Sequence, residues 1–268
     1  MSTPAADSTP AQGTPAGHGD DPAAQGGPAA QGGGARLRVL SYNVHGQRDD
    51  RAALAATVRA AAPDVLIVQE APRRFRWQHK CAALAEAFGM VVAVGGLPSL
   101  GNLVLTTLRV RVHRTWTQRY PLTPGRHLRG AAYAECSVGP DPDGTGTARF
   151  VVAGSHLSTD PAERPAQAAL LRSAVGGVRL PVILGADLND VPGGPAWQAV
   201  ADGLTDAAVA ADRADRLTFP CAGPRQRLDA VFVDPRIRVR DYDVPDTADS
   251  RRASDHLPVL ADLILPPG

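Results

Sequence analysis

Short apolar runs alternate with amphipathic stretches along most of the chain, starting near residue 36. Runs rich in Val, Ile and Leu that stop at Gly, Pro or polar residues predict β-strands, whereas apolar residues at helical spacing predict α-helices. The pattern predicts strands within residues 37–43, 64–70, 90–96, 101–108, 111–120, 129–138, 148–158, 180–188, 227–233, 236–244 and 257–265. It predicts helices over residues 51–62, 77–89, 163–175 and 195–204. Many strands with a few interspersed helices favour an α/β protein with mixed sheets.

The first 34 residues differ from the rest because they contain no Leu, Ile, Val or aromatic residue. A segment of Ala, Pro, Gly and Gln cannot bury enough apolar surface to offset the entropy of ordering, so we expect residues 1–34 to form a disordered tail. The segment lacks the basic and apolar regions of a secretory signal. Residues 35–268 are long enough for one globular domain, in which residues 139–148 predict a hairpin loop.

Composition narrows the function classes only slightly. The formal net charge of the 268 residues is +1, so no strong overall field draws the protein to nucleic acid or to an anionic membrane. Cys81, Cys136 and Cys221 are far apart and odd in number, which argues against a disulfide framework and against a CxxC metal site. Buried free thiols are typical of a reducing compartment, and no apolar stretch is long enough to span a bilayer. We therefore expect a cytoplasmic protein, and a monomer.

Polar residues that could take part in catalysis or bind a metal ion lie at the ends of the predicted strands. Four strands carry them at the carboxyl end: Asn43, Glu70, His156, and Asp187 with Asn189. Two strands carry them at the amino end: Asp229, and Asp255 with His256. Because antiparallel neighbours run in opposite directions, the start of one strand lies beside the end of the next. All six groups are therefore expected at one edge of the sheets.

Each of these residues alone has a structural explanation, such as a turn, a helix cap or a hydrogen-bonded core histidine. The stretch GADLND, residues 185–190, is itself compatible with a simple turn. Six strands with such residues at one edge would require repeated coincidence. Carboxylates and amides gathered without cysteine suit a hard cation such as Mg²⁺ or Mn²⁺ better than structural zinc.

The motifs SYNVHG, VQE, GNLVLT, GSHL, GADLND, RLDAVFV and SDHLPV occur in this order along the chain. Together they resemble the endonuclease/exonuclease/phosphatase superfamily of DNase-I-like metal-dependent phosphohydrolases. The resemblance spans about residues 37–265. It implies a four-layer α/β sandwich, with two mixed β-sheets packed face to face and helices outside, and makes residues 35–268 the catalytic domain.

The resemblance also implies roles for individual residues. Asn43, Glu70 and Asp255 would surround the Mg²⁺ or Mn²⁺ ion. Asp187 would orient or deprotonate the attacking water, and Asn189 would hold this water or a phosphoryl oxygen.

The remaining roles concern the phosphate. His156 and His256 would contact it, and Asp229 would be the carboxylate partner of His256. Arg129 lies where relatives often place a phosphate-binding arginine, although an ordinary surface arginine is an equal alternative. Asn102 would support His156. Some abasic-site nucleases carry an acid two residues after the asparagine, where this sequence has His45. This difference weakens the resemblance to abasic-site nucleases in particular.

Three functions stay open at this point. The first is an endonuclease, exonuclease or nucleotide phosphodiesterase. Basic residues of the predicted site loops favour an anionic substrate, although solvated arginines of an arginine-rich composition are an equal alternative: Arg73, Arg74, Arg76, Lys80, Arg225, Arg227, Arg251 and Arg252. Phe75 and Trp77 lie among the first group, where aromatic rings stack on bases. The second is a phosphatase or phosphodiesterase acting on a lipid or small phosphoester, such as an inositol phosphate or sphingomyelin. The third is a non-catalytic binding domain on the same fold, against which the complete residue set argues.

Overall fold

The computed structural model describes residues 34–139 and 147–268, which contain two six-stranded sheets. The first sheet has the order β11-β12-β1-β2-β4-β3. Its strands are β1 (Ala35–Asn43), β2 (Val65–Gln69), β3 (Val91–Gly95), β4 (Leu103–Thr106), β11 (Arg238–Asp243) and β12 (Val259–Leu265). Strands β1 and β2 are parallel, and their other neighbours are antiparallel, so the sheet is mixed.

The second sheet has the order β5-β6-β7-β8-β10-β9. Its strands are β5 (Val110–Arg119), β6 (Gly130–Val138), β7 (Ala148–His156), β8 (Val182–Asp187), β9 (Thr205–Asp206) and β10 (Asp229–Val233). Here β7 and β8 form the parallel pair, while β10 runs antiparallel to β8. The predicted tail and most of the predicted hairpin loop at 139–148 lie outside the described residues.

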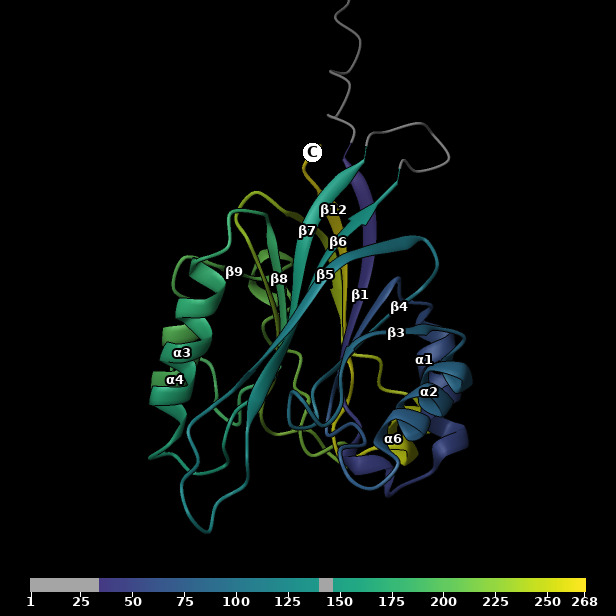
Figure 1. The fold of residues 1–268 in the computed structure, drawn as a ribbon, viewed down its shortest axis with the longest axis vertical. Coiled ribbons are helices and arrows are strands. Elements are labelled where there is room, and N and C mark those ends of the chain that lie inside the picture. Colours follow the sequence, from purple (N-terminus) through teal and green to yellow (C-terminus); the bar gives the residue numbers. More distant parts are fainter. Residues whose placement is uncertain (1–33, 140–146) are drawn as a thin grey trace, which may run out of the picture. The chain divides into compact units, whose positions relative to one another are not determined.

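Helices cover the outer faces of both sheets (Figure 1). The helices are α1 (Arg51–Ala61), α2 (Trp77–Phe88), α3 (Arg164–Gly176), α4 (Pro195–Ala201), α5 (Ala207–Ala210) and α6 (Ala248–Ala253), with a 3₁₀ turn η1 (His45–Gln47). One core lies between the sheets, a second joins the first sheet to α1 and α2, and a third joins the second sheet to α3 and α4. The predicted four-layer sandwich is confirmed. No helix among the described residues is long and apolar enough to cross a membrane.

The four predicted helices form where the sequence places them. Asp50 caps the start of α1 by accepting hydrogen bonds from the backbone N–H groups of Ala52 and Ala53. Helix α2 ends at Gly89, which has a φ of 72° and therefore suits the left-handed conformation of a helix C-terminus. The short elements α5, α6 and β9 were not predicted, because they are too short to show an apolar period.

Two glycines let the sheets approach each other closely near one end of the sandwich. Gly154 of β7 and Gly185 of β8 are register partners. A Cβ atom at either position would lie 2.7 Å from a methyl group of Ile67, which belongs to β2 of the opposite sheet. Because contacts this short do not occur, only glycine allows the observed spacing at these two points.

Candidate active site

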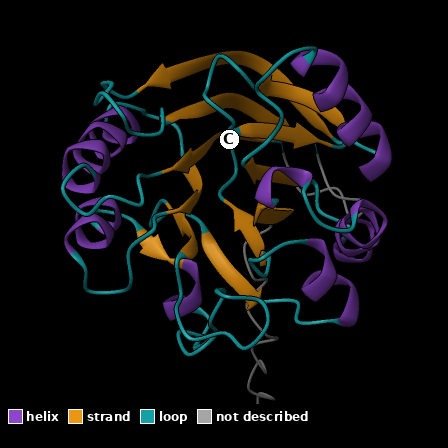
Figure 2. Cartoon of the chain, turned by 90° about the horizontal axis from the view of Figure 1, so that it is seen from below, coloured by secondary structure: helices purple, strands orange, loops and turns teal. Residues whose placement is uncertain are grey.

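The strand ends with polar residues meet at one edge, as the sequence predicted. In the second sheet, Asp187 lies directly opposite His156 on one side and Asp229 on the other. In the first sheet, Asn43 pairs in register with Gln69, the residue before Glu70. This edge is at the lower end of the sheets in Figure 1, and Figure 2 views the molecule from that side. Residues far apart in the sequence are thereby brought to one place.

Asp187 lies at the centre of the site and is buried. One carboxylate oxygen accepts a hydrogen bond from Nδ2 of Asn43 at 2.8 Å, which links the two sheets. The other accepts from the backbone N–H of Asn189 at 3.0 Å, and the φ of 48° at Asn189 turns the chain back toward the carboxylate. Nε2 of His156 lies 3.3 Å from the first oxygen, and Nε2 of His256 lies 3.8 Å from it. Asp187 is therefore held by fixed donors from both sheets.

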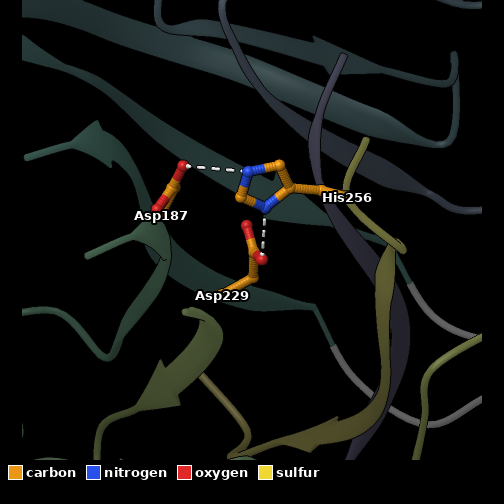
Figure 3. Close-up of side chains that lie close together, drawn as sticks. All are labelled: Asp187, Asp229 and His256. Carbon is orange, nitrogen blue, oxygen red and sulfur yellow. Dashed lines mark hydrogen bonds and ion pairs between the residues drawn. The ribbon is translucent and has the colours of Figure 1, made fainter. Parts of the chain in front are cut away.

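Asp229 and His256 form a buried pair beside Asp187 (Figure 3). Nδ1 of His256 donates to Oδ2 of Asp229 at 2.8 Å, and the opposite ring nitrogen faces Asp187. Burial acts to lower the pKa of His256, but the carboxylates of Asp229, Asp187 and Asp255 outweigh it and raise this pKa to about 10. His256 is therefore a cation that can donate a proton or a hydrogen bond from Nε2.

His156 has the opposite electrostatic setting. Burial, together with the neighbouring charges of Arg129 and His256, lowers its pKa to about 3 despite the carboxylate of Asp187, so the ring is neutral at pH 7. Nη1 of Arg129 lies 3.3 Å from Nδ1 of His156, and the carboxylate of Asp187 lies 3.3 Å from Nε2. Nδ2 of Asn189 lies 3.0 Å from the same Nε2. The two histidines thus have different protonation states within one site.

The predicted metal ligands Asn43, Glu70 and Asp255 surround the turn that follows β1. Oδ1 of Asn43 accepts from the backbone N–H of His45 at 3.0 Å, and Nε2 of His45 lies 3.8 Å from Oδ2 of Asp255. The Glu70 carboxylate lies beside Gly46, since a Cβ there would be 3.9 Å from Oε2 of Glu70. Glu70 has a φ of 58° and its carboxylate makes no hydrogen bond or ion pair with the described residues.

The donor set fits a hard divalent cation. Oxygen atoms of carboxylates and amides predominate, and Mg²⁺ and Mn²⁺ prefer such ligands. One group of possible ligand atoms, from Asp187, Asp229 and His256, lies within 4.8 Å of one another, and Oδ1 of Asp229 is buried without a hydrogen-bond partner among the described residues. This group differs from the predicted set. His256 is already paired with Asp229 through Nδ1, whereas the carboxylate of Glu70 has no hydrogen-bond or ion-pair partner among the described residues.

The two predicted substrate-binding residues have different positions. Arg129 is buried against His156, and burial lowers its pKa while the carboxylates of Asp187 and Glu70 act in the opposite direction. Arg129 is therefore not an ordinary surface arginine. Nδ2 of Asn102 donates to the backbone carbonyls of Ser99 and Gly130, at 2.9 and 2.8 Å. Gly130 is the register partner of His156, so Asn102 holds the adjacent backbone rather than the imidazole.

Sequence reasoning missed several residues that position the site. Oγ1 of Thr218 accepts from the backbone N–H of Asp229 at 3.3 Å, and the ring of Phe219 packs on His256 with centroids 4.7 Å apart. Oγ of Ser254 donates to the backbone carbonyl of Asn43 at 2.7 Å and accepts from the backbone N–H of His256 at 3.2 Å. Ser254 belongs to the SDHLPV motif, which could have indicated it. Nothing local in the sequence indicates Thr218.

A two-sheet α/β sandwich with carboxylates, amides and two histidines at one edge defines a protein of the DNase-I-like class. A family model described as "Endonuclease/Exonuclease/phosphatase family" matches residues 40–256, and the chain belongs to this family. A search of curated proteins found no match.

Solved structures confirm the fold. A family protein from Bacteroides thetaiotaomicron has a TM-score of 0.70 and 21% identity, over 87% of this chain and 99% of that one. A mannosyl-6-phosphatase from the same species has a TM-score of 0.69 and 20% identity, over 85% and 100% of the two chains. An endonuclease/exonuclease/phosphatase from Beutenbergia cavernae has a TM-score of 0.60 and 27% identity, over 86% and 72%.

Proposed function

We propose that the protein is a divalent-metal-dependent phosphoesterase that hydrolyses phosphodiester bonds. One observation supports this proposal above the others. The Asp187 carboxylate is fixed by Asn43 and by the Asn189 backbone, within 4 Å of a neutral and of a cationic histidine. Such an arrangement provides a base beside hydrogen-bond donors, which phosphoester hydrolysis requires.

In this proposal Asp187 orients and deprotonates the attacking water. His256 donates from Nε2 to a phosphoryl or leaving oxygen as negative charge develops, and Asp229 keeps the ring oriented and protonated. Arg129 neutralises a second phosphoryl oxygen, and Asn189 holds the water or the phosphate. Because these donors are fixed before substrate binds, little reorganisation is required during the reaction.

Asn43, Glu70 and Asp255 are the proposed metal ligands. A bound Mg²⁺ or Mn²⁺ would supply charge neutralisation at the phosphoryl and leaving oxygens. The exchange of Glu70 for Gln tests this assignment against the alternative group that contains Asp229. We expect Glu70→Gln to weaken Mn²⁺ binding in calorimetry, and Asp229→Asn to leave it nearly unchanged. The reverse result would show that Asp187, Asp229 and His256 are the metal ligands instead.

The substrate is to be identified by a panel. Supercoiled plasmid, single-stranded oligonucleotide, bis-p-nitrophenyl phosphate and phospholipid vesicles would each be incubated with Mg²⁺ or Mn²⁺. We propose nucleic acid or nucleotides as the substrate class, with a lipid or small phosphoester as the alternative, and the fastest turnover decides between them. Absence of hydrolysis on the whole panel, with a folded protein that still binds Mn²⁺, would favour a binding domain.

A further inference from the structure

Exposed apolar side chains lie on loops next to the candidate active site. Phe75 follows Glu70 by five residues and is 84% exposed. Leu97, Leu122 and Leu128 are also exposed, on the loops that precede β4 and β6. We call Phe75, Leu97, Leu122 and Leu128 the apolar rim. Monomeric proteins rarely gather exposed large apolar residues in one place unless a partner covers them.

Specific contacts join the loops of the rim into one surface. Nη1 of Arg73 donates to the backbone carbonyls of Leu100 and Leu128, at 2.9 and 3.0 Å, and so ties the three loops together. The Trp77 ring lies against Gly96, where a Cβ atom would be 2.5 Å away. The loop between β5 and β6 extends past the sheets at the end that carries the site (Figure 1).

The rim is also next to the catalytic residues, because Leu128 immediately precedes Arg129 and Arg129 contacts His156. A partner that covers the rim would therefore lie at the entrance to the site.

The charge around Phe75 is positive, whereas acids pair with the loop that carries Leu122 and Leu128: Arg126 lies 2.6 Å from Asp160, and Thr123 bonds to Glu163. Residues 71–76, 95–101 and 121–129 contain no Asp or Glu. Arg74 and Arg76, on either side of Phe75, are exposed, and their side chains make no hydrogen bond or ion pair with the described residues. No side chain caps the N-terminus of α2, so its free N–H groups add to the positive potential. Phe75 is thus an exposed ring between two unpaired cations.

We propose that the apolar rim docks on an anionic lipid surface, with Phe75 and the leucines in the interfacial layer and Arg74 and Arg76 at the headgroups. Large apolar side chains flanked by arginine are what such an interface attracts. A nucleic-acid strand is the weaker occupant, since three of the four rim residues are leucines and bases stack on aromatic rings. The proposal concerns docking only and does not depend on which phosphoester is hydrolysed.

Co-sedimentation of the full chain with phosphatidylcholine vesicles, with and without phosphatidylglycerol, tests this proposal. We expect binding to the anionic vesicles that decreases as salt rises. Phe75→Ser should weaken this binding about tenfold or more, because burial of a phenyl ring is lost. Substitution of both Arg74 and Arg76 by Gln should have an effect of about the same size. Hydrolysis of bis-p-nitrophenyl phosphate by Phe75→Ser should equal that of the wild type, which separates docking from catalysis.

Matched controls are available at the far end of the sheets. Leu108 is 91% exposed in the turn after β4, and Arg238 is exposed at the start of β11. Leu108→Ser and Arg238→Gln should bind vesicles like the wild type. Absence of binding to anionic vesicles, or an equal loss in Leu108→Ser, would overturn the proposal. It would also be overturned if Phe75→Ser weakened binding of a labelled single-stranded oligonucleotide and left vesicle binding unchanged, because the rim would then be a nucleic-acid surface.

Discussion

The exchange of Asp187 for Asn separates a catalytic role from a structural one. The side chain keeps its size but loses the negative charge that orients and deprotonates water. We expect turnover to fall by about 10²- to 10⁴-fold, the usual contribution of a positioned base. The loss should appear in kcat without a rise in KM, as for an interaction made in the transition state.

The cost in stability can be worked out from the hydrogen bonds. Asp187 accepts from Nδ2 of Asn43 through one oxygen and from the N–H of Asn189 through the other. Asn has a single side-chain oxygen, so its NH₂ group must face one of these donors. One buried hydrogen bond is lost, at a cost of roughly 1–3 kcal/mol. For a domain of this size each kcal/mol lowers Tm by roughly 2–4 °C, so we expect a measurable shift in a folded protein.

Asp190 provides the matched control, three residues further along the same loop. Its Oδ2 accepts from the backbone N–H of Ala196 at 2.9 Å, at the start of α4. Asn keeps one side-chain oxygen for the start of α4, and the exposed backbone N–H of Val191, which bonds to Oδ1 of Asp190, can turn to water instead. Asp190→Asn should therefore lower stability less than the buried exchange and leave turnover unchanged. The assay is steady-state hydrolysis of bis-p-nitrophenyl phosphate, with thermal unfolding followed by circular dichroism. Wild-type turnover in a folded Asp187→Asn protein would refute the catalytic role and leave GADLND as a turn.

Three further predictions follow. Excess EDTA should abolish hydrolysis and Mg²⁺ or Mn²⁺ should restore it, because the donors are carboxylates and amides; full activity in EDTA would contradict this. Removal of residues 1–34 should leave Tm and turnover nearly unchanged, since their composition offers little to pack, and a large fall in Tm would show that the tail docks. Burial raises the pKa of Cys81 to about 11, so its thiolate is scarce at pH 8. Alkylation of Cys81, located by mass spectrometry, should therefore be slower in the native protein than in the urea-unfolded chain; equal rates would show that the thiol is accessible.

Local information was enough to predict most strands and the longer helices, whereas the packing of two sheets face to face was implied by the family resemblance. The strands are short apolar runs whose limits are set by polar residues, glycine or proline, as in β8, which ends at Asp187. Helix α1 has both a capping Asp50 and a following Pro63, and such signals lie within a few residues of the helix they bound. The common edge of the site also followed from strand direction alone.

Features that are too short to show a periodic pattern, or that depend on pairing between distant residues, could not be predicted. Helix α6 has no apolar period, and a capping box between Thr247 and Ser250 defines its start. Strand β9 has two residues and exists only because it pairs with β10. The protonation states of His156 and His256 depend on burial and on neighbours from other strands, so the two histidines look equivalent in the sequence but differ in the structure.

The distance between the two sheets depends on individual glycines and decides whether residues from both sheets can meet. Ile67 of β2 packs on Gly154 and Gly185, each of which lies two residues before the end of its strand in the direction of the site. With no side chain at these two positions, the sheets come close enough for Asn43 to reach Asp187 across the gap, at 2.8 Å. A larger residue at either glycine would separate the sheets at this point and lengthen that bond. The small residues of two buried strands therefore determine whether polar groups from two sheets form one site.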